Sequence, residues 1–337
     1  MAFIDTILQE PRYGWATPEG TLIKPTKKQL FSEAFRRINI FQSKKNWISL
    51  ISWVMTAAMI PFFILFITQY FSWWLVLVIA LYSMVIMGTH GTVWFHRFCT
   101  HRAYKFSSPL WKLITQNMVI KTFPEEVYVI SHHVHHAKSD TPGDPYNPQG
   151  GFMYCMLSDV NHQGINKQMN EVDYGRTARM MQHTGVLVNS YQQYRNWGSV
   201  TNPFYAVALW ICNWTFWFII LYAIGGMPLV TAIFSAAMLW FVLVRAFNYT
   251  GHGKGDAKHI DGIDFDRSNL SINQTRPGLF TGEWHNNHHL YPGSARAGFL
   301  PYQFDPAWIC IYGMHRIGMV SSYHDSKKEF LKRFNNK

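Results

Sequence analysis

The chain has 337 residues, of which 48% are hydrophobic and only 15% are charged, and its formal net charge is +11. Its mean hydropathy of −0.06 resembles that of a soluble protein, but the charges are unevenly spread. No Asp, Glu, Lys or Arg occurs between Lys45 and Arg97, or between Arg195 and Arg245. Charge-free runs of about 50 residues exclude an ordinary soluble domain, in which roughly a quarter of the residues are charged. We therefore predict an integral membrane protein.

The basic residues lie beside the two apolar runs and do not form a stripe along one predicted recognition helix. This distribution argues against nucleic-acid binding. It favours the anionic surface of a membrane, or a phosphate-bearing substrate, as the partner of the positive charge.

Residues 1–46 are predicted to form a cytosolic N-terminal segment that contains one amphipathic helix. Between residues 28 and 41, apolar side chains recur near one helical face: Leu30, Phe31, Ala34, Phe35 and Ile38. This pattern fits a helix lying on the membrane surface and, equally well, a helix packed on the rest of the cytosolic part.

Each apolar run is long enough to cross a membrane twice, because one crossing takes about 20 apolar residues. The first run divides into residues 47–69 and 71–93, and the second into residues 204–224 and 227–247. Gly225, Gly226 and Pro228 mark the second turn. We predict an all-α fold with four transmembrane helices in two hairpins, over residues 47–93 and 204–247.

Lys and Arg residues are concentrated before the first predicted span and after the second. The positive-inside rule therefore places the N-terminal segment and both remaining segments in the cytoplasm. Those two segments, residues 94–203 and 248–337, are predicted to form a helical cytosolic cap. The resulting protein is multi-pass and carries its polar chemistry on the cytoplasmic side.

Ten of the sixteen histidines fall in four short groups, in the predicted cap or at its junction with the spans. The groups contain His96 and His101; His132, His133, His135 and His136; His252, four residues after Asn248; and His285, His288 and His289. In the pattern H-x-x-H-H the three imidazoles share one helical face, so they can converge on a metal ion. The second and fourth groups both have this pattern.

Two positions need separate treatment. His133 is rotated about 100° from His132 on a helix, so it is left out of the candidate ligands. His96 and His101 are five residues apart and do not align on a regular helix, but they can converge where the helix leaves the membrane or where it carries a local bulge, a feature common at functional sites.

The remaining candidate ligands number nine, which is too many for one ion and suits two six-coordinate ions with positions left open. Neutral imidazole binds iron, zinc, copper or nickel. A structural zinc site closes at four ligands, so the excess indicates a dinuclear catalytic centre. Two alternatives remain: histidines that simply form internal hydrogen bonds, and the ligands of a metal transporter, although transporter ligands lie near the bilayer midplane.

Further motifs accompany the histidines. They are Arg97 with Thr100-His101-Arg102, Asp144-Pro145 with Gly151-Phe152, Trp284 before the last group, and Pro292, Ser294-Ala295-Arg296, Gly298, Gln303, Asp305 and Trp308 after it. With these motifs the sequence, from about residue 85 to about residue 320, resembles the integral-membrane fatty acid desaturases, most closely the acyl-CoA delta-9 group.

The resemblance implies a cytosolic site with two iron ions (Fe²⁺), which uses O₂ and two electrons to remove two hydrogens from adjacent methylenes of an acyl chain. It implies as metal ligands the nine histidines already selected: His96, His101, His132, His135, His136, His252, His285, His288 and His289. Asn248 stands where the family has an asparagine that acts through a water molecule. The implied substrate is an acyl-CoA or an acyl-lipid. No His-Pro-Gly-Gly haem signature occurs, so an external donor, cytochrome b5-like or a ferredoxin with its reductase, is expected.

Two departures from the family pattern concern head-group recognition and the position of the double bond. Ser131 and His133 stand where the family often has an acidic residue and an arginine, and Gly282-Glu283-Trp284 run together without the usual spacer.

A lipid hydroxylase with the same ligands is the alternative enzyme.

Residues around the histidines have predicted supporting roles. Asp140, Asp144, Glu283 and Asp305 are candidates for orienting the imidazoles through their other nitrogen. Arg97, Arg102, Lys105 and Lys138 are candidates for contact with substrate phosphates or with the anionic leaflet.

Overall fold

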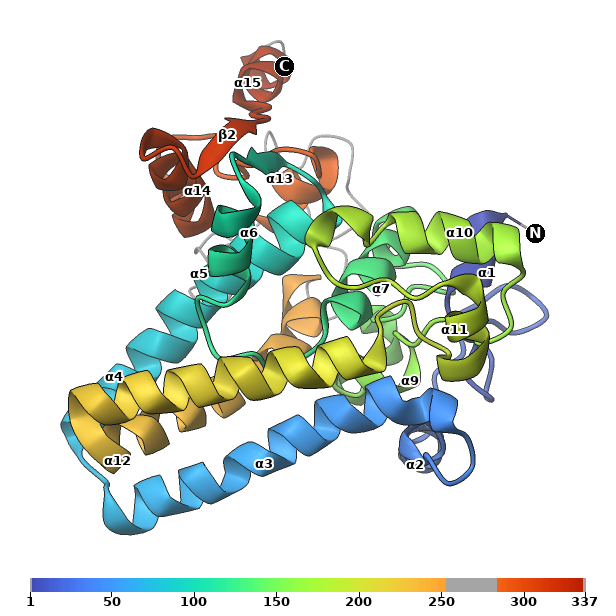
Figure 1. Cartoon of the computed structure of the whole chain (residues 1–337). Helices are drawn as coiled ribbons and strands as arrows, with labels where there is room; N and C mark the ends of the chain where they lie inside the picture. Colours follow the sequence, from blue (N-terminus) through green and yellow to red (C-terminus); the bar gives the residue numbers. More distant parts are fainter. Residues whose placement is uncertain (1, 253–283, 336–337) are drawn as a thin grey trace.

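The computed structural model describes residues 2–252 and 284–335, and this part of the chain is mostly helical (Figure 1). Its one sheet has two antiparallel strands, β1 (Tyr104–Phe106) and β2 (Val320–Tyr323), with Tyr104 opposite Tyr323. This pairing ties the segment after the first histidine group to the C-terminal region. The mainly helical fold class predicted from the sequence is therefore correct for the described residues.

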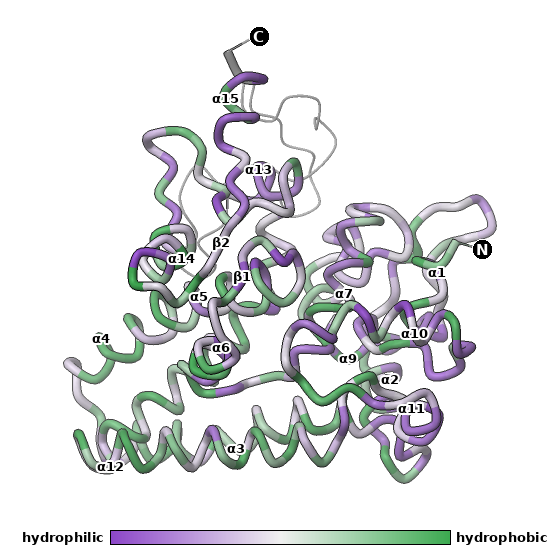
Figure 2. The backbone as a smooth tube through the Cα atoms, turned by 45° about the horizontal axis from the view of Figure 1, so that its top comes forward, coloured by the Kyte–Doolittle hydropathy of each residue, from purple (hydrophilic) through white to green (hydrophobic). Residues whose placement is uncertain are grey.

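Within residues 2–252 and 284–335, three helices are long and apolar enough to cross a membrane, judged by length and composition. They cover Lys44–Gln69, Trp73–Thr100 and Pro203–Phe247. The first contains α3 (Trp47–Gln69), and the third lies within α12 (Pro203–Gly251). Figure 2 shows these segments as the continuous hydrophobic part of the chain, apart from the more polar cap.

α12 is broken in its middle. Gly226 has φ 63° and ψ −163°, which is not helical, and Pro228 follows it. The rings of Trp214 and Phe234 are only 5.3 Å apart, whereas twenty residues of straight helix would separate them by about 30 Å. The two halves of α12 therefore fold back on each other, and glycine fits the turn because it adopts positive φ without strain.

The second apolar helix continues beyond the predicted end at residue 93. It comprises α4 (Trp73–Leu81), the π-helical η2 (Tyr82–Met87), α5 (Gly88–His90) and the π-helical η3 (Gly91–Thr100). Residues 92–100 are buried. The last two turns of this helix therefore lie in the protein interior and not on its exposed apolar surface. The prediction from span length alone could not detect that the helix passes from an exposed to a buried environment.

Short helices build the rest of the cap around these long ones. They are α1 (Phe3–Ile7), α2 (Lys27–Ile38), η1 (Lys44–Asn46), α6 (Pro109–Gln116), α7 (Glu125–Lys138), η4 (Pro148–Gly150), α8 (Phe152–Met156), α9 (Ser158–Asn161), α10 (Glu171–Arg179), η5 (Gln182–Thr184), α11 (Tyr191–Trp197), α13 (His285–Leu290), α14 (Pro306–Arg316) and α15 (Lys327–Asn335). The two that matter most for the site are α7 and α13.

α2 has two different apolar sides and not the single apolar face that the sequence suggested. Leu30 is buried against the cap, where its carbonyl oxygen accepts a hydrogen bond from Nδ2 of Asn161 at 2.9 Å. Phe31 and Phe35 point outward, with 44% and 67% of their surface exposed. Packing on the cap is therefore confirmed, and a place on the membrane surface stays a prediction, with which the exposed aromatic rings agree.

α7 is fixed in place by the two carboxylates of its first turn. Glu125 accepts hydrogen bonds from Nζ of Lys121 at 2.7 Å and from Nε2 of Gln116 at 3.0 Å. Glu126 accepts hydrogen bonds from the backbone N–H groups of Val200 and Thr201 at 3.0 and 2.6 Å. Acidic groups at a helix N-terminus also interact favourably with the helix dipole. The helix that carries the second histidine group is thereby anchored from both sides.

Candidate metal centre

The predicted π-bulge is present at the first histidine group. In η3 the backbone N–H of His101 donates to the carbonyl oxygen of His96 at 3.1 Å, a bond that spans five residues. On a regular α-helix these side chains would diverge by about 140°, but the wider turn brings their ring centroids to 5.0 Å. The bulge therefore allows His96 and His101 to contribute to the same metal site.

The nine selected histidines form two groups. The five-histidine site contains His96, His101, His132, His136 and His288, and the four-histidine site contains His135, His252, His285 and His289. Within each group the potential ligand nitrogens lie within 4.8 Å of one another. α7 and α13 each contribute to both sites.

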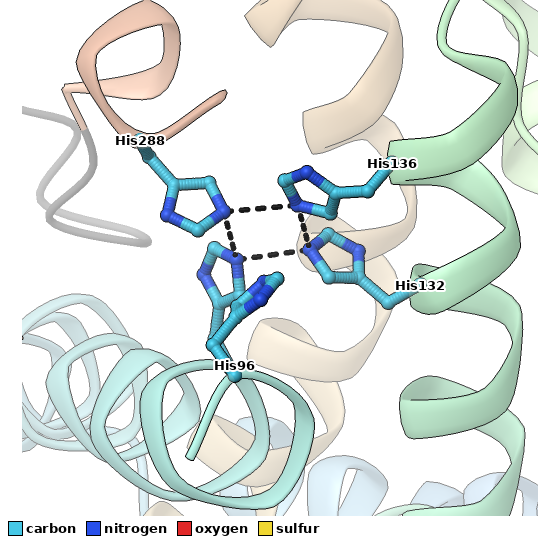
Figure 3. A group of neighbouring side chains, drawn as sticks. His96, His132, His136 and His288 are labelled. Atoms are coloured by element: carbon cyan, nitrogen blue, oxygen red, sulfur yellow. Dashed lines mark hydrogen bonds between the residues drawn. The ribbon is translucent and has the colours of Figure 1, made fainter. Parts of the chain in front are cut away.

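In the five-histidine site, four Nε2 atoms form a closed ring of short contacts (Figure 3). Their separations are 2.8 Å from His96 to His288, 2.9 Å from His96 to His132, 3.1 Å from His132 to His136 and 3.0 Å from His136 to His288. Metal–imidazole bonds of about 2.1 Å at right angles place neighbouring nitrogens about 3.0 Å apart. These separations therefore match those of neighbouring ligands around an octahedral metal ion.

The four-histidine site shows the same close approach. Nε2 of His285 lies 2.7 Å from Nε2 of His252 and 3.2 Å from Nε2 of His289. The ring of His135 lies 4.8 Å from that of His252, measured between centroids. Both groups have the donor chemistry and the spacing of a metal site.

Oxygen atoms from the loop after α7 hold the outer nitrogens of several rings. Oδ1 of Asp144 lies 2.9 Å from Nδ1 of His135, and Oδ1 of Asp140 lies 2.9 Å from Nδ1 of His252. The hydroxyl of Tyr146 lies 2.5 Å from Nδ1 of His132. The contacts to His135 and His132 are hydrogen bonds, and such bonds fix the orientation of a ligating imidazole and leave Nε2 facing inward.

Asp144 acts as an acceptor in this arrangement. Its Oδ2 accepts from the backbone N–H of Asp140 at 3.0 Å, and its Oδ1 accepts from the backbone N–H of Tyr146 at 3.1 Å. Nδ1 of His135 is therefore the donor in their hydrogen bond, and the lone pair of Nε2 points into the four-histidine site.

Burial keeps several of the clustered imidazoles neutral. It lowers the pKa of His132, His135 and His288 well below the ordinary value, and the neighbouring histidines lower it further. Neutral imidazole is the form that binds metal ions. Closely packed, buried imidazoles of this kind can bind a metal cation, because protonation of one ring is opposed by burial and by its neighbours.

His133, which was left out of the candidate ligands, and several residues with predicted supporting roles lie outside the two histidine sites. The ring of His133 is 6.3 Å from that of His101 and belongs to neither site. Arg97, predicted to meet phosphates, is instead fully buried and pairs with Asp305 at 3.4 Å. Asp305 thus supports Arg97 and not an imidazole. The side chains of Asn248 and Glu283 lie outside the described part of the structure.

Lys138 forms an ion pair with Asp5, so it too has a partner within the protein, whereas Arg102 and Lys105 are exposed as expected. Tyr128 and Tyr146 are neighbours of the site that the sequence analysis missed. The ring of Tyr128 stacks on His132, with centroids 5.1 Å apart. Nothing in the local sequence distinguishes these two tyrosines from the other aromatic residues of the chain.

A largely apolar cavity adjoins the five-histidine site. Its lining residues are Ser52, Phe123, Val127, Tyr128, Tyr146, Ser158, Asp159, Gln163, Phe241, Val244 and Arg245. The cavity volume is about 60 Å³, so a long acyl chain must extend beyond it. Because Tyr128 and Tyr146 both contact His132, one end of the cavity lies directly beside the histidines.

The chain matches the fatty acid desaturase family over residues 71–297, and it belongs to that family. It is 26% identical over 274 residues to the sn-1 stearoyl-lipid 9-desaturase of Synechocystis sp., covering 76% of this chain and 73% of the relative. It is 25% identical over 307 residues to the icosanoyl-CoA 5-desaturase of Limnanthes douglasii, covering 86% and 75%. The acyl-CoA C20 Delta5-desaturase of Anemone leveillei is 29% identical over 280 residues, covering 79% and 81%.

Membership of this family makes the protein an oxidoreductase that acts on fatty acyl chains. The histidine groups and their neighbouring motifs predicted a fatty acid desaturase, and the family match confirms this prediction. The names of the relatives differ in the position of the double bond and in the acyl carrier.

Proposed function

We propose that this protein is an oxygen-dependent fatty acyl desaturase that introduces a cis double bond at the delta-9 position of a saturated acyl chain, in lipid biosynthesis. Two iron ions would occupy the five-histidine and the four-histidine sites. The observation that carries the proposal is the convergence of Nε2 atoms in two adjacent sites, one with the spacing of neighbouring ligands around an octahedral ion. The delta-9 assignment is supported by the name of the Synechocystis relative.

The nine histidines would be the metal ligands, and Asn248 would act through a water molecule. When bound, the iron pair supplies the chemistry that activates O₂ for removal of unreactive hydrogens. The protein's own part is to hold the imidazoles neutral and oriented. Asp144, Asp140 and Tyr146 do this through the outer nitrogens of His135, His252 and His132.

The reaction balances with an external reductant. Two C–H bonds on adjacent methylenes break and one C=C bond forms. O₂ is reduced to two water molecules by the two hydrogens removed, together with two electrons and two protons from outside. The electrons would come from a separate donor, cytochrome b5-like or a ferredoxin with its reductase.

The acyl chain would lie in the cavity beside Tyr128 and Tyr146. Its walls exclude water and hold one pair of methylenes next to the histidines, which is the positioning contribution to catalysis. The acyl carrier would be coenzyme A or a glycerolipid, as in the names of the relatives.

In the membrane, four helical segments would cross in two hairpins, residues 47–93 and 204–247. The fold-back of α12 at Gly226 supports the second hairpin. Residues 1–46, 94–203 and 248–337 would then lie on the cytoplasmic side and form the cap, in agreement with the distribution of Lys and Arg.

Expression in a host that lacks its own desaturase tests the function directly. Gas chromatography of total fatty acids, with mass spectrometry of derivatised double bonds, should reveal a new monounsaturated product. The His288→Ala variant should insert into the membrane and give no product. A hydroxylated product without an olefin would instead identify a lipid hydroxylase with the same ligands.

A further inference from the structure

A buried ion pair stands beside the cavity and has no part in the metal centre. Nη2 of Arg245 donates to Oδ2 of Asp159 at 2.8 Å, and the two side chains are 6% and 11% exposed. The guanidinium packs on the faces of Trp53 and Phe241, at 4.4 and 3.9 Å from the ring centroids. Arg245 is the first charged residue after the second apolar run.

Stability alone is a weak explanation for this pair. Moving two charges out of water costs free energy that their attraction often fails to recover, and apolar residues of similar size commonly serve as well. Burial raises the pKa of Asp159 even with Arg245 beside it, which shows that the desolvation cost at this position is large. The pair therefore calls for a functional explanation.

Part of the hydrogen-bonding capacity of the pair is unused. Nε of Arg245 and Oδ1 of Asp159 are buried and have no hydrogen-bond partner among residues 2–252 and 284–335. Both side chains line the cavity. Buried donors are rarely left unsatisfied in folded proteins, so the N–H at Nε is a donor that a bound group can use.

A row of contacting rings connects the ion pair to the metal centre. The guanidinium lies on Phe241, which stacks on Phe123 with centroids 5.7 Å apart. Phe123 in turn lies 6.2 Å from Tyr128, and Tyr128 stacks on His132 at 5.1 Å. The ion pair and the histidines are thus separated by an apolar wall along which methylene groups can lie.

We propose that Arg245, held by Asp159, binds the carbonyl oxygen of the ester or thioester that joins the acyl chain to its carrier. This inference rests on the proposed desaturase function and adds to it the group that positions the substrate. A neutral carbonyl fits the site because it accepts from Nε–H. A free carboxylate or a phosphate does not fit, because Asp159 already neutralises Arg245 and would repel a second anion.

An anchor at the carbonyl group has a measurable consequence. The reacting methylenes are then selected by their distance from the carboxyl end, whatever the length of the chain beyond them. The thioester of coenzyme A and the ester of a glycerolipid share this carbonyl, so the inference holds for either carrier.

The first experiment uses the unmodified protein in membranes and supplies saturated chains that differ in length by two carbons. The double bond should appear at the same position counted from the carboxyl end in each product. A double bond that keeps its position from the methyl end overturns the inference while leaving the desaturase function intact. If no unsaturated product forms with any chain, the proposed function fails and this inference fails with it.

The second experiment removes the donor. Arg245→Lys keeps the charge for Asp159 but lacks Nε–H, and the double variant Arg245→Met with Asp159→Leu replaces both charges by apolar groups. We expect an increase in KM of about tenfold, the size expected from one lost hydrogen bond, and a mixture of positional isomers, with iron content unchanged. A single isomer with unchanged KM in both variants would refute the anchor.

The matched control is another buried arginine. Arg37 pairs with Glu33 at 2.7 Å, both side chains are 2% exposed, and neither residue lines the cavity. Arg37→Lys should lower stability without changing the position of the double bond. If the Arg245 variants fail to fold, the chain-length experiment on the unmodified protein can still refute an anchor at the carbonyl group.

Discussion

Nδ1 of His135 lies 2.9 Å from Oδ1 of Asp144, and both side chains are fully buried. The same carboxylate also accepts hydrogen bonds from two backbone N–H groups in the turn after α7. The orientation of one imidazole in the four-histidine site is therefore set by the backbone of a neighbouring loop. This relationship provides the first prediction.

Asp144→Asn should weaken metal binding without removing a ligand. The amide can no longer accept at every position that the carboxylate serves, so His135 loses its fixed orientation. The typical cost of such a change is about 10- to 100-fold in metal affinity or activity. Iron content of the purified protein, together with product formation, measures the effect. Glu171→Gln, an exposed position in α10, is the control and should behave like the unmodified protein.

His132→Ala and His133→Ala form a matched pair of neighbours with different expected effects. Nε2 of His132 lies within 3.1 Å of two other ligand candidates, whereas His133 belongs to neither site. The first variant should lose iron and activity, and the second should retain more of both. Equal iron loss in the two, measured by metal analysis, would contradict the assignment of the helix face.

Glu126 predicts a dependence of stability on pH. Burial raises its pKa from 4.5 to about 7, against the two backbone N–H groups that lower it. The folded state therefore binds a proton more tightly than the unfolded state does. Its contribution to stability is fully present below pH 4.5 and is lost as the pH rises towards about 7.

Since one pKa unit corresponds to about 1.4 kcal/mol, this loss amounts to at most about 3 kcal/mol. Thermal unfolding in detergent across this range should show that the unmodified protein loses stability relative to Glu126→Gln, which cannot titrate. Parallel curves for the two proteins would argue against a shifted carboxyl group.

Gly226→Ala tests the turn inside α12. A residue with Cβ at φ 63° is strained by about 1–2 kcal/mol, so the variant should unfold at a lower temperature. Gly313→Ala is the control, because that glycine lies inside α14 and no atom lies within 4 Å of its added Cβ. There the helix propensity of alanine should raise stability by up to about 1 kcal/mol. Similar shifts in both variants would count against a strained turn at Gly226.

Local spacing was sufficient to predict much of the candidate site. His132, His135 and His136 share a face because a helix repeats every 3.6 residues, and the bulge between His96 and His101 follows from their mismatch with that repeat. The partners of these side chains were harder to predict. Asp144 could be suggested only by its nearness in sequence, and Tyr128 carries no distinguishing signal at all.

Contacts between distant segments account for most of what the sequence did not reveal. Arg245 and Asp159 are 86 residues apart, and Arg97 and Asp305 are 208 residues apart, so no periodic pattern links them. The extension of the second apolar helix to Thr100 depends on protein packing around its last turns, which composition does not describe. The distant ion pairs and the end of this helix both depend on tertiary packing, which the local sequence pattern does not specify.

α7 and α13 each contribute three histidines, which are divided between the two sites. His132 and His135 differ by three residues, which corresponds to about 4.5 Å along the helix axis. The rise of the helix thus separates the five-histidine site from the four-histidine site. A shift of either helix would disturb both sites together, so we expect the two ions to be gained and lost cooperatively.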